Sequence, residues 1–277
     1  MRNLTGRTAI VTGAAGGIGT EVAKLFDRHG IKLVLTDINA EGLAQTARVL
    51  KQEPLCVVCD ITRPEEVHGL VNTAHARYGT VDILVNNAGI IVPALFEHST
   101  HEDIERQVAI NLLGAITCTR EVIPAMRQGG SGHIVTVSSM AGLVPETHSA
   151  IYTATKFALR GFNLTLAVEL KRHHIGVSTI FPDSVATPML RYEAEHGGSP
   201  LTFLCPPQSP ALVAEAILKA ILRNKVEVYV PASTGVFSKA VMCWPWAVTK
   251  IWPLLEYLGG RKKPALAERL RATLPEK

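Results

Sequence analysis

The sequence has few runs of like charge, no regular cysteine pattern, and no internal repeat or low-complexity tract. Lys and Arg together number 28 and Asp and Glu 24, so the formal net charge is only +4, and the basic runs at 171–174 and 261–263 are short. Nucleic-acid binding usually needs a concentrated basic surface, so we expect no nucleic-acid partner. With 47% hydrophobic residues, the chain of 277 residues can bury a full core.

Five cysteines occur at irregular spacing, and Cys56 and Cys59 form a CxxC pair within an apolar run. Side chains three residues apart on a strand point to opposite faces, so this pair is not expected to share a metal ion or a disulfide. We interpret both as reduced, buried side chains, which fits a cytoplasmic protein. His173 and His174 lack a nearby third ligand, so no metal site is expected. The strand pattern starts near Thr8, and we expect no signal peptide before it.

Seven short apolar runs alternate with stretches of helical pattern. They are nearly continuous in Val, Ile and Leu, which is typical of parallel strands covered by helices on both faces. The runs are Thr8–Thr12, Lys32–Asp37, Leu55–Asp60, Asp82–Asn86, His133–Ser138, Gly176–Phe181 and Val226–Val230. We therefore expect an α/β fold, in which a single doubly wound Rossmann-type domain holds about seven parallel strands with helices on both faces.

Two stretches lie outside this alternation and set the expected domain limits. Residues 1–231 are predicted to form a Rossmann-fold catalytic domain, in which 188–207 form a substrate lid, and residues 232–277 to form a C-terminal amphipathic extension. Apolar residues of the extension repeat at 4-3-4-3 spacing: Phe237, Val241, Trp244, Val248, Ile251, Leu255 and Leu258. Charged residues and prolines argue against a lipid-spanning helix. Tryptophans and a basic flank suit a peripheral contact of 236–263 with a membrane surface, and the alternative is packing on a partner subunit or on the lid.

A glycine-rich motif follows the first predicted strand. Gly13, Gly17 and Gly19 come directly after the apolar residues 9–11, and a helical pattern follows them. A glycine turn lets the backbone approach a pyrophosphate, and the N-terminus of a helix favours its negative charge. The position of the glycines after the first strand therefore indicates a dinucleotide site.

Asp37 ends the second predicted strand. A carboxylate there can accept hydrogen bonds from both hydroxyls of the adenosine ribose, and it would repel a 2′-phosphate. Neither the glycine loop nor the two residues after Asp37 include Arg or Lys, so NAD is favoured over NADP as the cofactor. The alternative is that Asp37 is simply a turn residue at the end of a strand.

Two further strand ends carry polar residues. Asp60 is placed to meet the adenine ring, and Asn86-Asn87-Ala88-Gly89 ends the fourth predicted strand. A small residue and free amides there can line a cofactor, but a tight turn needs Asn and Gly just as much. Both interpretations of the quartet stay open from the residues alone.

Tyr152 and Lys156 lie four apart on a helix predicted from about 149 to 172, so they share one face. Tyrosine ordinarily has a pKa of about 10, and a neighbouring cation stabilises the phenolate. A decrease of about three pKa units needs about 4 kcal/mol, which Lys156 and an oxidised, positively charged nicotinamide together can supply. Ser139 ends the fifth predicted strand, at the sheet edge where ligands bind, and its hydroxyl can orient a substrate oxygen against Tyr152.

Two more polar residues belong to the same part of the chain. Ser138 points away from Ser139 if the strand continues, so we expect a structural role for it. Asn111 lies in apolar surroundings within a helix predicted to start near Thr100. This asparagine can mend a local helix kink or hold a water molecule, and the two roles are compatible.

Together these motifs resemble those of the short-chain dehydrogenase/reductase family, in its order and spacing over about residues 5–231. The matching elements are TGAAGGIG at 12–19, Asp60, NNAG at 86–89, Asn111, Ser139, Tyr152, Lys156 and the segment Pro182–Thr187. The resemblance implies NAD(P)-dependent hydride transfer between an alcohol and a carbonyl. It implies that Tyr152 is the general acid/base, that Ser139 orients the substrate, that Lys156 binds ribose and lowers the tyrosine pKa, and that Asn111 holds a water of a proton relay.

The resemblance also implies a set of cofactor-binding residues. They are Gly13, Gly17, Ile18, Gly19, Asp37, Ile38, Asp60, Ile61, Asn87, Ala88, Gly89, Tyr152, Lys156, Pro182, Val185 and Thr187. Val185 and Thr187 would contact the nicotinamide carboxamide. A homodimer or homotetramer is implied as well, with the helices near 100–127 and 149–172 paired across subunits.

One position departs from the family pattern, because Asp183 follows Pro182 where glycine is usual. Aspartate tolerates left-handed backbone better than most residues, so the turn can survive. Alternatively, its carboxylate adds negative charge near the nicotinamide or the substrate mouth.

The predicted function is hydride transfer between NAD(H) and an apolar secondary alcohol or ketone. Apolar lid residues favour a pocket for a steroid-like, terpenoid or lipid carbonyl compound, unless they simply pack on the body of the protein. They are Met189, Leu190, Tyr192, Leu201, Phe203 and Leu204. The alternative functions are an NADPH-dependent reductase of carrier-bound 3-oxoacyl chains, a non-catalytic dinucleotide-binding sensor, and a redox-neutral lyase or epimerase.

Overall fold

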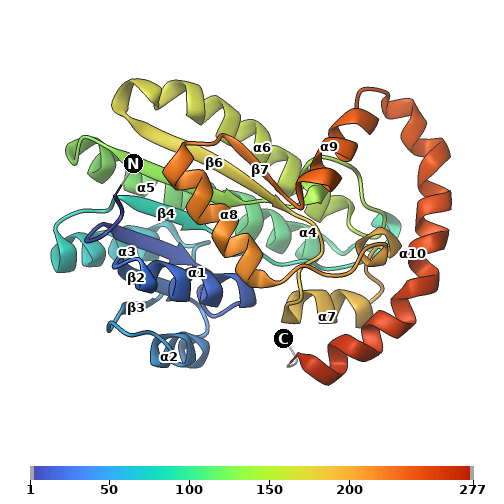
Figure 1. Cartoon of the computed structure of the whole chain (residues 1–277), viewed down its shortest axis with the longest axis horizontal. Helices are drawn as coiled ribbons and strands as arrows, with labels where there is room; N and C mark the ends of the chain where they lie inside the picture. The colour runs from blue at the N-terminus through green and yellow to red at the C-terminus, as the bar shows by residue number, and fades with distance from the viewer. Residues whose placement is uncertain (1–2, 275–277) are drawn as a thin grey trace.

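The computed structural model describes residues 3–274, and its centre is one sheet of seven parallel strands (Figure 1). The strand order is β3-β2-β1-β4-β5-β6-β7. The strands are β1 (Thr8–Thr12), β2 (Lys32–Asp37), β3 (Leu55–Val58), β4 (Ile83–Asn86), β5 (Gly132–Val137), β6 (Ile175–Pro182) and β7 (Glu227–Val230). The predicted α/β fold with about seven parallel strands is confirmed. Of the predicted ranges 1–231 and 232–277, residues 1–2 and 275–277 lie outside the described residues.

Helices connect the strands and cover both faces of the sheet. They are α1 (Gly17–Arg28), α2 (Ala40–Arg48), α3 (Pro64–Tyr78), α4 (His101–Val108), α5 (Ala115–Gln128), α6 (Ala150–Glu169), α7 (Pro188–Glu195), α8 (Pro210–Arg223), α9 (Ala232–Val241) and α10 (Pro245–Thr273). Short helical turns are η1 (Phe96–His98), η3 (Met140–Gly142), η4 (Lys171–His173) and η5 (Pro200–Phe203), and η2 (Ala109–Gly114) is a π-helix that joins α4 to α5. Figure 1 shows α10 as a long arm at the edge of the molecule farthest from α2.

Capping residues fix several helix ends. The hydroxyl of Thr100 accepts a hydrogen bond from the Asp103 amide at 3.1 Å, which begins α4. Ser209 caps α8 in the same way through the Ala211 amide at 3.3 Å. Gly79 ends α3 in left-handed backbone with φ of 77°. These caps satisfy amide and carbonyl groups that a helix end leaves open.

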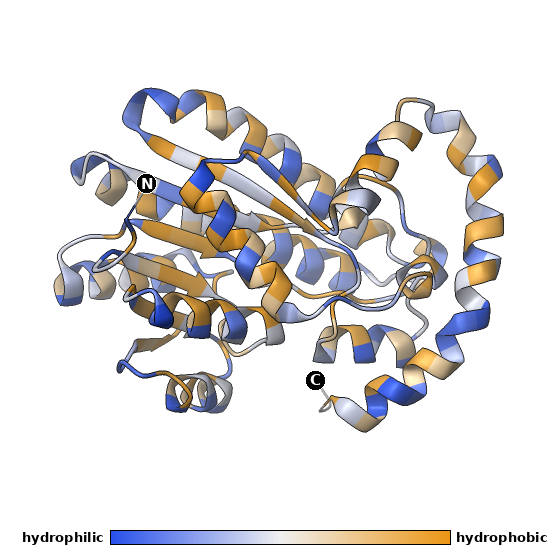
Figure 2. Cartoon of the chain, viewed as in Figure 1, coloured by the Kyte–Doolittle hydropathy of each residue, from blue (hydrophilic) through white to orange (hydrophobic). Residues whose placement is uncertain are grey.

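Two hydrophobic clusters lie on opposite faces of the sheet. One packs α1 and α8 on the sheet and includes Phe26 and Ile217, and the other packs α3 and α5 and includes Met126. Neighbouring residues of one strand join different clusters, as Val11 joins the first and Ile10 the second. The central strands are therefore hydrophobic along their length, which Figure 2 shows for the middle of the sheet.

The edge strand β3 is less well covered than the other strands. Cys56 and Val58 are exposed there, because β3 has a neighbouring strand on one side only. The expectation that every strand is covered on both faces, and that Cys56 is buried, is therefore wrong at this edge. Cys59 is buried as expected, and burial raises the pKa of its thiol to about 11. The two thiols do not share a face, and all five cysteines are free.

The strand order reverses at β1, which lies between β2 and β4. In open α/β sheets, ligands bind outside the carboxyl ends of the strands at such a reversal. The ends of β1 and β4 are joined there through the hydroxyl of Thr12, which accepts hydrogen bonds from the amides of Asn87 at 3.0 Å and Ala88 at 3.1 Å. The fold therefore brings the predicted glycine motif and the NNAG quartet to one place.

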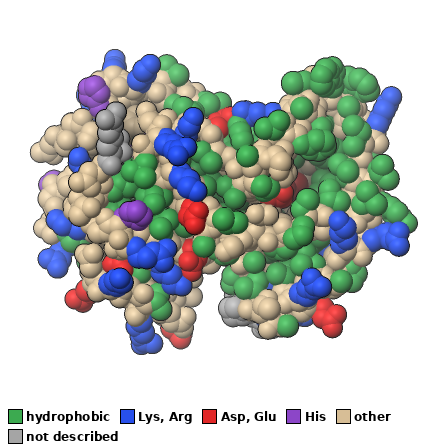
Figure 3. Space-filling model, viewed as in Figure 1, with side chains coloured by type: hydrophobic (Ala, Val, Ile, Leu, Met, Phe, Trp, Pro, Cys, Tyr) green, Lys and Arg blue, Asp and Glu red, His purple; other side chains and the backbone are tan. Residues whose placement is uncertain are grey.

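The C-terminal part consists of two helices, α9 and α10, which share the residues of the apolar repeat. Four residues of that stripe are exposed: Phe237, Trp244, Ile251 and Leu258. The α10 side chains that face the protein are instead Trp252, Ala267 and Leu270. The apolar repeat at 4-3-4-3 spacing crosses the break between the two helices. Figure 3 shows hydrophobic side chains gathered over α9 and the first half of α10.

One helix among the described residues, His101–Gln128, is long and apolar enough to cross a membrane by length and composition alone. It comprises α4, η2 and α5. Its α5 part contributes Cys118, Val122 and Met126 to the cluster beneath the sheet. Buried core helices of other proteins meet the same criteria, so length and composition alone do not identify this helix as a membrane span.

Candidate active site

The glycine turn between β1 and α1 is shaped by close backbone contacts. Gly13 has a φ of +63°, and a Cβ added at Gly19 would overlap the carbonyl oxygen of Gly13. A Cβ added at Gly17 would lie 2.9 Å from the Cγ2 atom of Thr187. Helix α1 begins at Gly17 without a side-chain cap, so its first amide groups are available to a ligand. The turn therefore fits the pyrophosphate of a dinucleotide.

Asp37 lies against this turn. Its Oδ2 atom accepts a hydrogen bond from the Ala15 amide at 3.1 Å, and its Oδ1 atom accepts one from the Asn39 amide at 3.0 Å. Both oxygens retain a lone pair for the hydroxyls of a ribose. The side chain of the next residue, Ile38, is 70% exposed. Asp37 is thus both a turn residue and a candidate ribose ligand.

Asp60 and Ile61 lie beside Asp37, because the Cys59 amide donates to the Asp37 carbonyl at 3.2 Å. The Oδ1 atom of Asp60 accepts hydrogen bonds from the amide and the hydroxyl of Thr62 at 2.9 and 2.7 Å. Ile61 is buried. The carboxylate of Asp60 therefore holds its own turn, and its predicted contact with adenine remains a prediction.

The residues after β4 connect the two central strands. The side-chain amide of Asn87 donates to the carbonyls of Thr12 and Gly13, both at 3.0 Å. A Cβ added at Gly13 would lie 2.8 Å from the Cα atom of Ala88. Residues 87–89 continue past β4 in extended chain without a tight turn, and they lie beside the glycine turn. The interpretation of the quartet as cofactor-lining residues remains a prediction.

Ser139, Tyr152 and Lys156 come together at the carboxyl end of β5. The hydroxyl of Ser139 lies near enough to the phenol of Tyr152 to lower the pKa of the tyrosine. The Nζ atom of Lys156 lies 5.3 Å from the centre of the Tyr152 ring and donates to the Val137 carbonyl at 3.1 Å. Ser138 instead donates from its hydroxyl to the Lys156 carbonyl at 3.2 Å, in agreement with the expected structural role.

Asn111 lies in the π-helix η2, which is the local irregularity that its sequence context suggested. Its Oδ1 atom accepts a hydrogen bond from the Ile90 amide at 2.7 Å, and its Nδ2 atom donates to the Ile90 carbonyl at 2.9 Å. A Cβ added at Gly89 would lie 3.3 Å from Oδ1 of Asn111 and 3.6 Å from Nζ of Lys156. Gly89 thus leaves space between these two polar groups. The water-holding role of Asn111 remains a prediction.

Carboxyl groups that the sequence analysis did not single out surround Tyr152. Burial, then the carboxylates of Glu193 and Glu146, raise the pKa of Tyr152, while the hydrogen bond from Ser139 acts in the opposite direction. Burial lowers the pKa of Lys156 to about 8. Glu146 follows Pro145 in an irregular loop, so no periodicity or spacing could have marked it. In the protein alone, these surroundings keep the phenol protonated.

Asp183 needs no left-handed backbone. Among residues 3–274, positive φ outside glycine occurs at His148, His174 and Asn224. The Asp183 amide continues the pairing of β6 with β7 by donating to the Val230 carbonyl at 2.8 Å. Burial raises the pKa of the Asp183 carboxyl. The pKa of Glu146 is raised to about 7, mainly by burial of its own carboxyl and in smaller part by the charge of Asp183. The chain therefore passes Asp183 without left-handed backbone, and a charge of Asp183 near a nicotinamide or a substrate remains a prediction.

The segment after β6 connects the sheet to the lid. Pro182 is the last residue of β6, and Val185 is buried and paired with Gln208 across the base of the lid. The Ala186 amide donates to the Gln208 carbonyl at 2.9 Å. Thr187 caps α7 and lies against Gly17. The lid therefore starts at the edge of the glycine turn.

Helix α10 holds the lid from outside. Leu190 and Phe203 of the lid pack with Leu270 of α10, so packing is the correct interpretation for these two lid residues. The Nζ atom of Lys263 donates to the Gly198 carbonyl at 2.9 Å. The Nε1 atom of Trp252 donates to the Pro145 carbonyl at 2.8 Å. Residues more than 100 positions apart therefore shape one side of the site.

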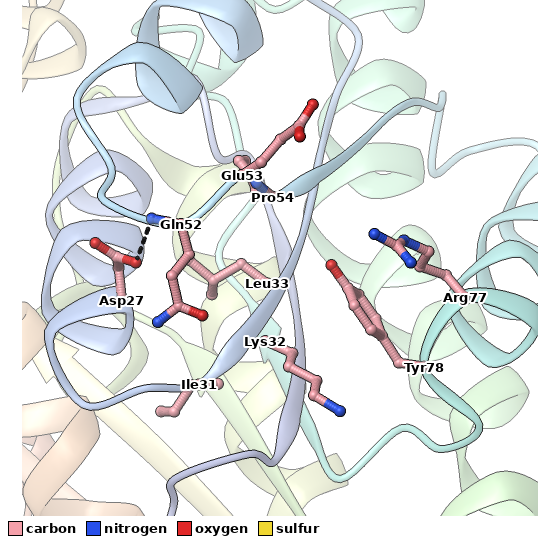
Figure 4. A pocket seen from close by; sticks show the side chains of 9 residues that line it. All are labelled: Asp27, Ile31, Lys32, Leu33, Gln52, Glu53, Pro54, Arg77 and Tyr78. Carbon is pink, nitrogen blue, oxygen red and sulfur yellow. Dashed lines mark hydrogen bonds between the residues drawn. The ribbon is translucent and has the colours of Figure 1, made fainter.

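A small cavity of about 230 Å³ lies at the opposite edge of the sheet, near the starts of β2 and β3 (Figure 4). It contains none of the predicted site residues. Its lining residues are Asp27, Ile31, Lys32, Leu33, Gln52, Glu53, Pro54, Arg77 and Tyr78. Asp27 accepts hydrogen bonds there from the amides of Lys51 at 2.8 Å and Gln52 at 3.1 Å. It therefore holds the loop between α2 and β3. Within the described residues, no group of three or more His, Cys, Asp or Glu side chains is arranged to hold a metal ion.

A parallel sheet with a glycine turn at its strand-order reversal and a Ser-Tyr-Lys group at the same edge defines a dinucleotide-binding oxidoreductase. The chain belongs to the short-chain dehydrogenase family, whose sequence model matches residues 7–197. It is similar to momilactone A synthase from Oryza sativa subsp. japonica, with 39% identity over 193 residues that cover 69% of this chain and 70% of that protein.

Two further similarities cover more of the chain. The 17-beta-hydroxysteroid dehydrogenase 13 of Mus musculus is 33% identical over 237 residues, which cover 83% of this chain and 76% of that protein. The crystal structure of the 3-ketoacyl-(acyl-carrier-protein) reductase from Brucella melitensis, complexed with NADH, matches with a TM-score of 0.75 and 30% identity. That match covers 82% of this chain and 98% of the other.

Proposed function

We propose that the protein transfers a hydride between NAD(H) and an apolar secondary alcohol or ketone. The observation that carries the proposal is the contact of Ser139, Tyr152 and Lys156 at the edge of the sheet that also holds the glycine turn. A site of this kind needs a proton donor beside the reacting carbon and a cofactor within reach of it. Residues suited to both requirements lie at one edge of the sheet, which supports the proposal.

In this proposal the cofactor lies across the ends of β1 and β4. Gly13, Gly17 and Gly19 hold its pyrophosphate, and Asp37 accepts hydrogen bonds from the adenosine ribose. Gly89 and Thr187 leave room for the nicotinamide half, and Lys156 binds the second ribose. When bound, the cofactor supplies or accepts the hydride.

The protein's own residues handle the proton. Tyr152 donates its phenolic proton to the carbonyl oxygen in reduction and accepts a proton from the alcohol in oxidation. Ser139 holds the substrate oxygen beside the phenol, and Asn111 holds a water of a relay to solvent. Because burial and the nearby carboxylates raise the pKa of Tyr152, the protein alone favours the phenol as a proton donor. The oxidation direction therefore depends most on the ammonium group of Lys156.

The preference for NAD over NADP rests on Asp37, whose carboxylate lies at the glycine turn and would repel a 2′-phosphate. The NADH complex of the Brucella melitensis reductase supports the same choice. The name of that reductase also keeps a second candidate open, the reduction of carrier-bound 3-oxoacyl chains. NADPH-linked turnover of such chains would favour the second candidate.

An apolar substrate of steroid-like, terpenoid or lipid type is supported by half-buried lid residues such as Met189 and Leu204 and by the similarity to a hydroxysteroid dehydrogenase. Glu146 lies near Tyr152, and Asp183 lies near Glu146, so polar groups adjoin the apolar residues. A substrate with an apolar body and one or two polar groups suits this combination. We further infer that the enzyme acts in the cytoplasm as a homodimer or homotetramer, and that 236–263 contact a membrane surface or another protein.

The test is turnover of a panel of secondary alcohols with NAD and with NADP, in the wild type and in Tyr152→Phe. We expect NAD-linked oxidation of bulky apolar alcohols, and a loss of kcat of about 10²- to 10⁴-fold in the variant, with unchanged NADH affinity measured by fluorescence. Tyr78→Phe, at the opposite edge of the sheet, is the control. Tight NADH binding without turnover of any alcohol or ketone in the wild type would favour the sensor hypothesis instead.

A further inference from the structure

The outer surface of α9 and α10 exposes many large apolar side chains, part of which Figure 3 shows. We name this set the outer patch. Its members are Val236, Phe237, Trp244, Trp246, Ile251, Leu254, Tyr257 and Leu258, each between 39% and 65% exposed. With about 200 Å² for each free side chain, the outer patch exposes on the order of 800 Å² of apolar surface. The largest patch of a typical monomer is about 300–600 Å², so this one indicates a binding surface.

Helix α10 has two different faces. Trp252, Lys263 and Leu270 lie on the inner face, where they contact the loop after β5 and the lid. With 100° between successive residues, Trp246, Leu254 and Tyr257 of the outer patch lie on the opposite side of the helix. The inner face therefore fixes α10 to the protein and leaves the outer patch directed away from it.

Basic residues outnumber acidic ones around the outer patch, where Lys239 is paired with Glu227. Between residues 232 and 263 the sequence contains five basic residues and a single acidic one, Glu256, which is half-buried. Lys250 and Arg261 are exposed, and the Nζ atom of Lys250 lies 5.3 Å from the centre of the Trp246 ring. Tryptophan and tyrosine beside basic side chains are typical of segments that lie in the interface of a bilayer.

We infer that the outer patch binds the surface of an anionic lipid bilayer, with α10 lying in the plane of the membrane. A second copy of the chain on the same patch would bring Lys250 and Arg261 of both copies together, and this repulsion disfavours self-association. Anionic headgroups instead complement these charges, and the apolar side chains enter the boundary of the acyl chains. Lipid binding of this kind does not depend on catalysis.

If the proposed function also holds, membrane binding has a consequence for substrate delivery. The inner face of α10 contacts the lid and the Pro145 loop, so the protein segments that surround the substrate lie one helix diameter, about 10 Å, from the lipid. An apolar alcohol or ketone dissolved in the bilayer would then reach the site without crossing bulk water.

The experiment is co-sedimentation of the full chain with vesicles of phosphatidylcholine alone and of phosphatidylcholine mixed with phosphatidylglycerol. We expect binding to the mixed vesicles, a blue shift of tryptophan emission, and weaker binding at high salt. The double variant Trp246→Gln with Leu254→Gln should bind the mixed vesicles at least about tenfold more weakly. The control variant is Val49→Gln with Val58→Gln, which removes exposed apolar side chains on α2 and β3 and should bind as the wild type does.

Three results would overturn the inference. They are absence of wild-type binding to mixed vesicles, equal binding to vesicles of phosphatidylcholine alone, and a wild-type dimer in solution that Trp246→Gln with Leu254→Gln dissociates. NADH binding, measured on each protein, reports the fold of the variants. Since vesicle binding needs no substrate, failure of the proposed hydride transfer would leave this result unchanged, and the two failures can be told apart.

Discussion

The cofactor edge and the lid are held in different ways, although they meet at Thr187. At the cofactor edge, backbone groups contact each other directly, as where a Cβ at Gly19 would overlap the Gly13 carbonyl. At the lid, side chains of a distant helix do the holding, as Trp252 does through its hydrogen bond to the Pro145 carbonyl at 2.8 Å. The glycine turn depends on close contacts between backbone atoms, and the lid depends on the packing of α10 against it. We therefore predict that changes in α10 alter the predicted lid, residues 188–207, without disturbing the glycine turn.

The largest effect that tests this comparison is expected from Gly19→Ala at the cofactor edge. The new Cβ would overlap the Gly13 carbonyl, so the glycine turn must open. We expect NADH affinity to fall by about 100-fold or more, measured by fluorescence titration. Gly69→Ala is the matched control, because a Cβ added there meets nothing within 4 Å. Unchanged affinity in Gly19→Ala would mean that the turn does not hold the cofactor.

An intermediate effect is expected from Gly259→Ala, at the contact of α10 with the lid. A Cβ there would overlap the carbonyl oxygen of Pro200, so α10 must move away from η5. We expect KM for the substrate to rise by about tenfold while the Kd of NADH stays the same. The neighbouring change Gly260→Ala meets nothing within 4 Å and should leave both constants unaltered. A parallel loss of NADH affinity in Gly259→Ala would contradict the separation of the two regions.

The smallest expected effect is electrostatic and concerns Glu146, which lies between the two regions. Burial and Asp183 raise its pKa from 4.5 to about 7, so the folded protein binds this proton more tightly than the unfolded chain does. Stability is therefore lost as the pH rises from about 4.5 through about 7. Glu146→Gln keeps a neutral side chain, and we expect it to be more stable than the wild type by about 1–3 kcal/mol near pH 8, with little difference near pH 4.

Urea unfolding at the two pH values measures the effect of Glu146→Gln. The exposed carboxylate Glu97 provides the control, and Glu97→Gln should show no comparable dependence on pH. The same stability difference at both pH values would indicate that packing, rather than the charge of Glu146, is responsible.

The parts of the molecule that the sequence predicts well are those set by local patterns. Seven apolar runs give the seven strands, a glycine turn marks the reversal at β1, and a spacing of four places Tyr152 and Lys156 on one helix face. The exposure of Cys56 was missed, because a run of residues does not say which strand lies at the edge. Glu146 was missed because its position near Tyr152 depends on an irregular loop. The buried face of α10 depends on docking to the lid, and no periodicity of the segment encodes it.

The π-helix at Asn111 acts as a one-residue insertion in an otherwise continuous helix. Each residue of a helix turns the chain by about 100°, so removing one residue from 109–114 would rotate everything after it by that angle. Thr119, which accepts a hydrogen bond from the Asn86 side chain at 2.9 Å, would then face away from β4. The extra residue therefore fixes the rotation of α5 relative to α4. With this rotation Asn111 forms hydrogen bonds with Ile90, and α5 directs Thr119 and its apolar face toward the sheet.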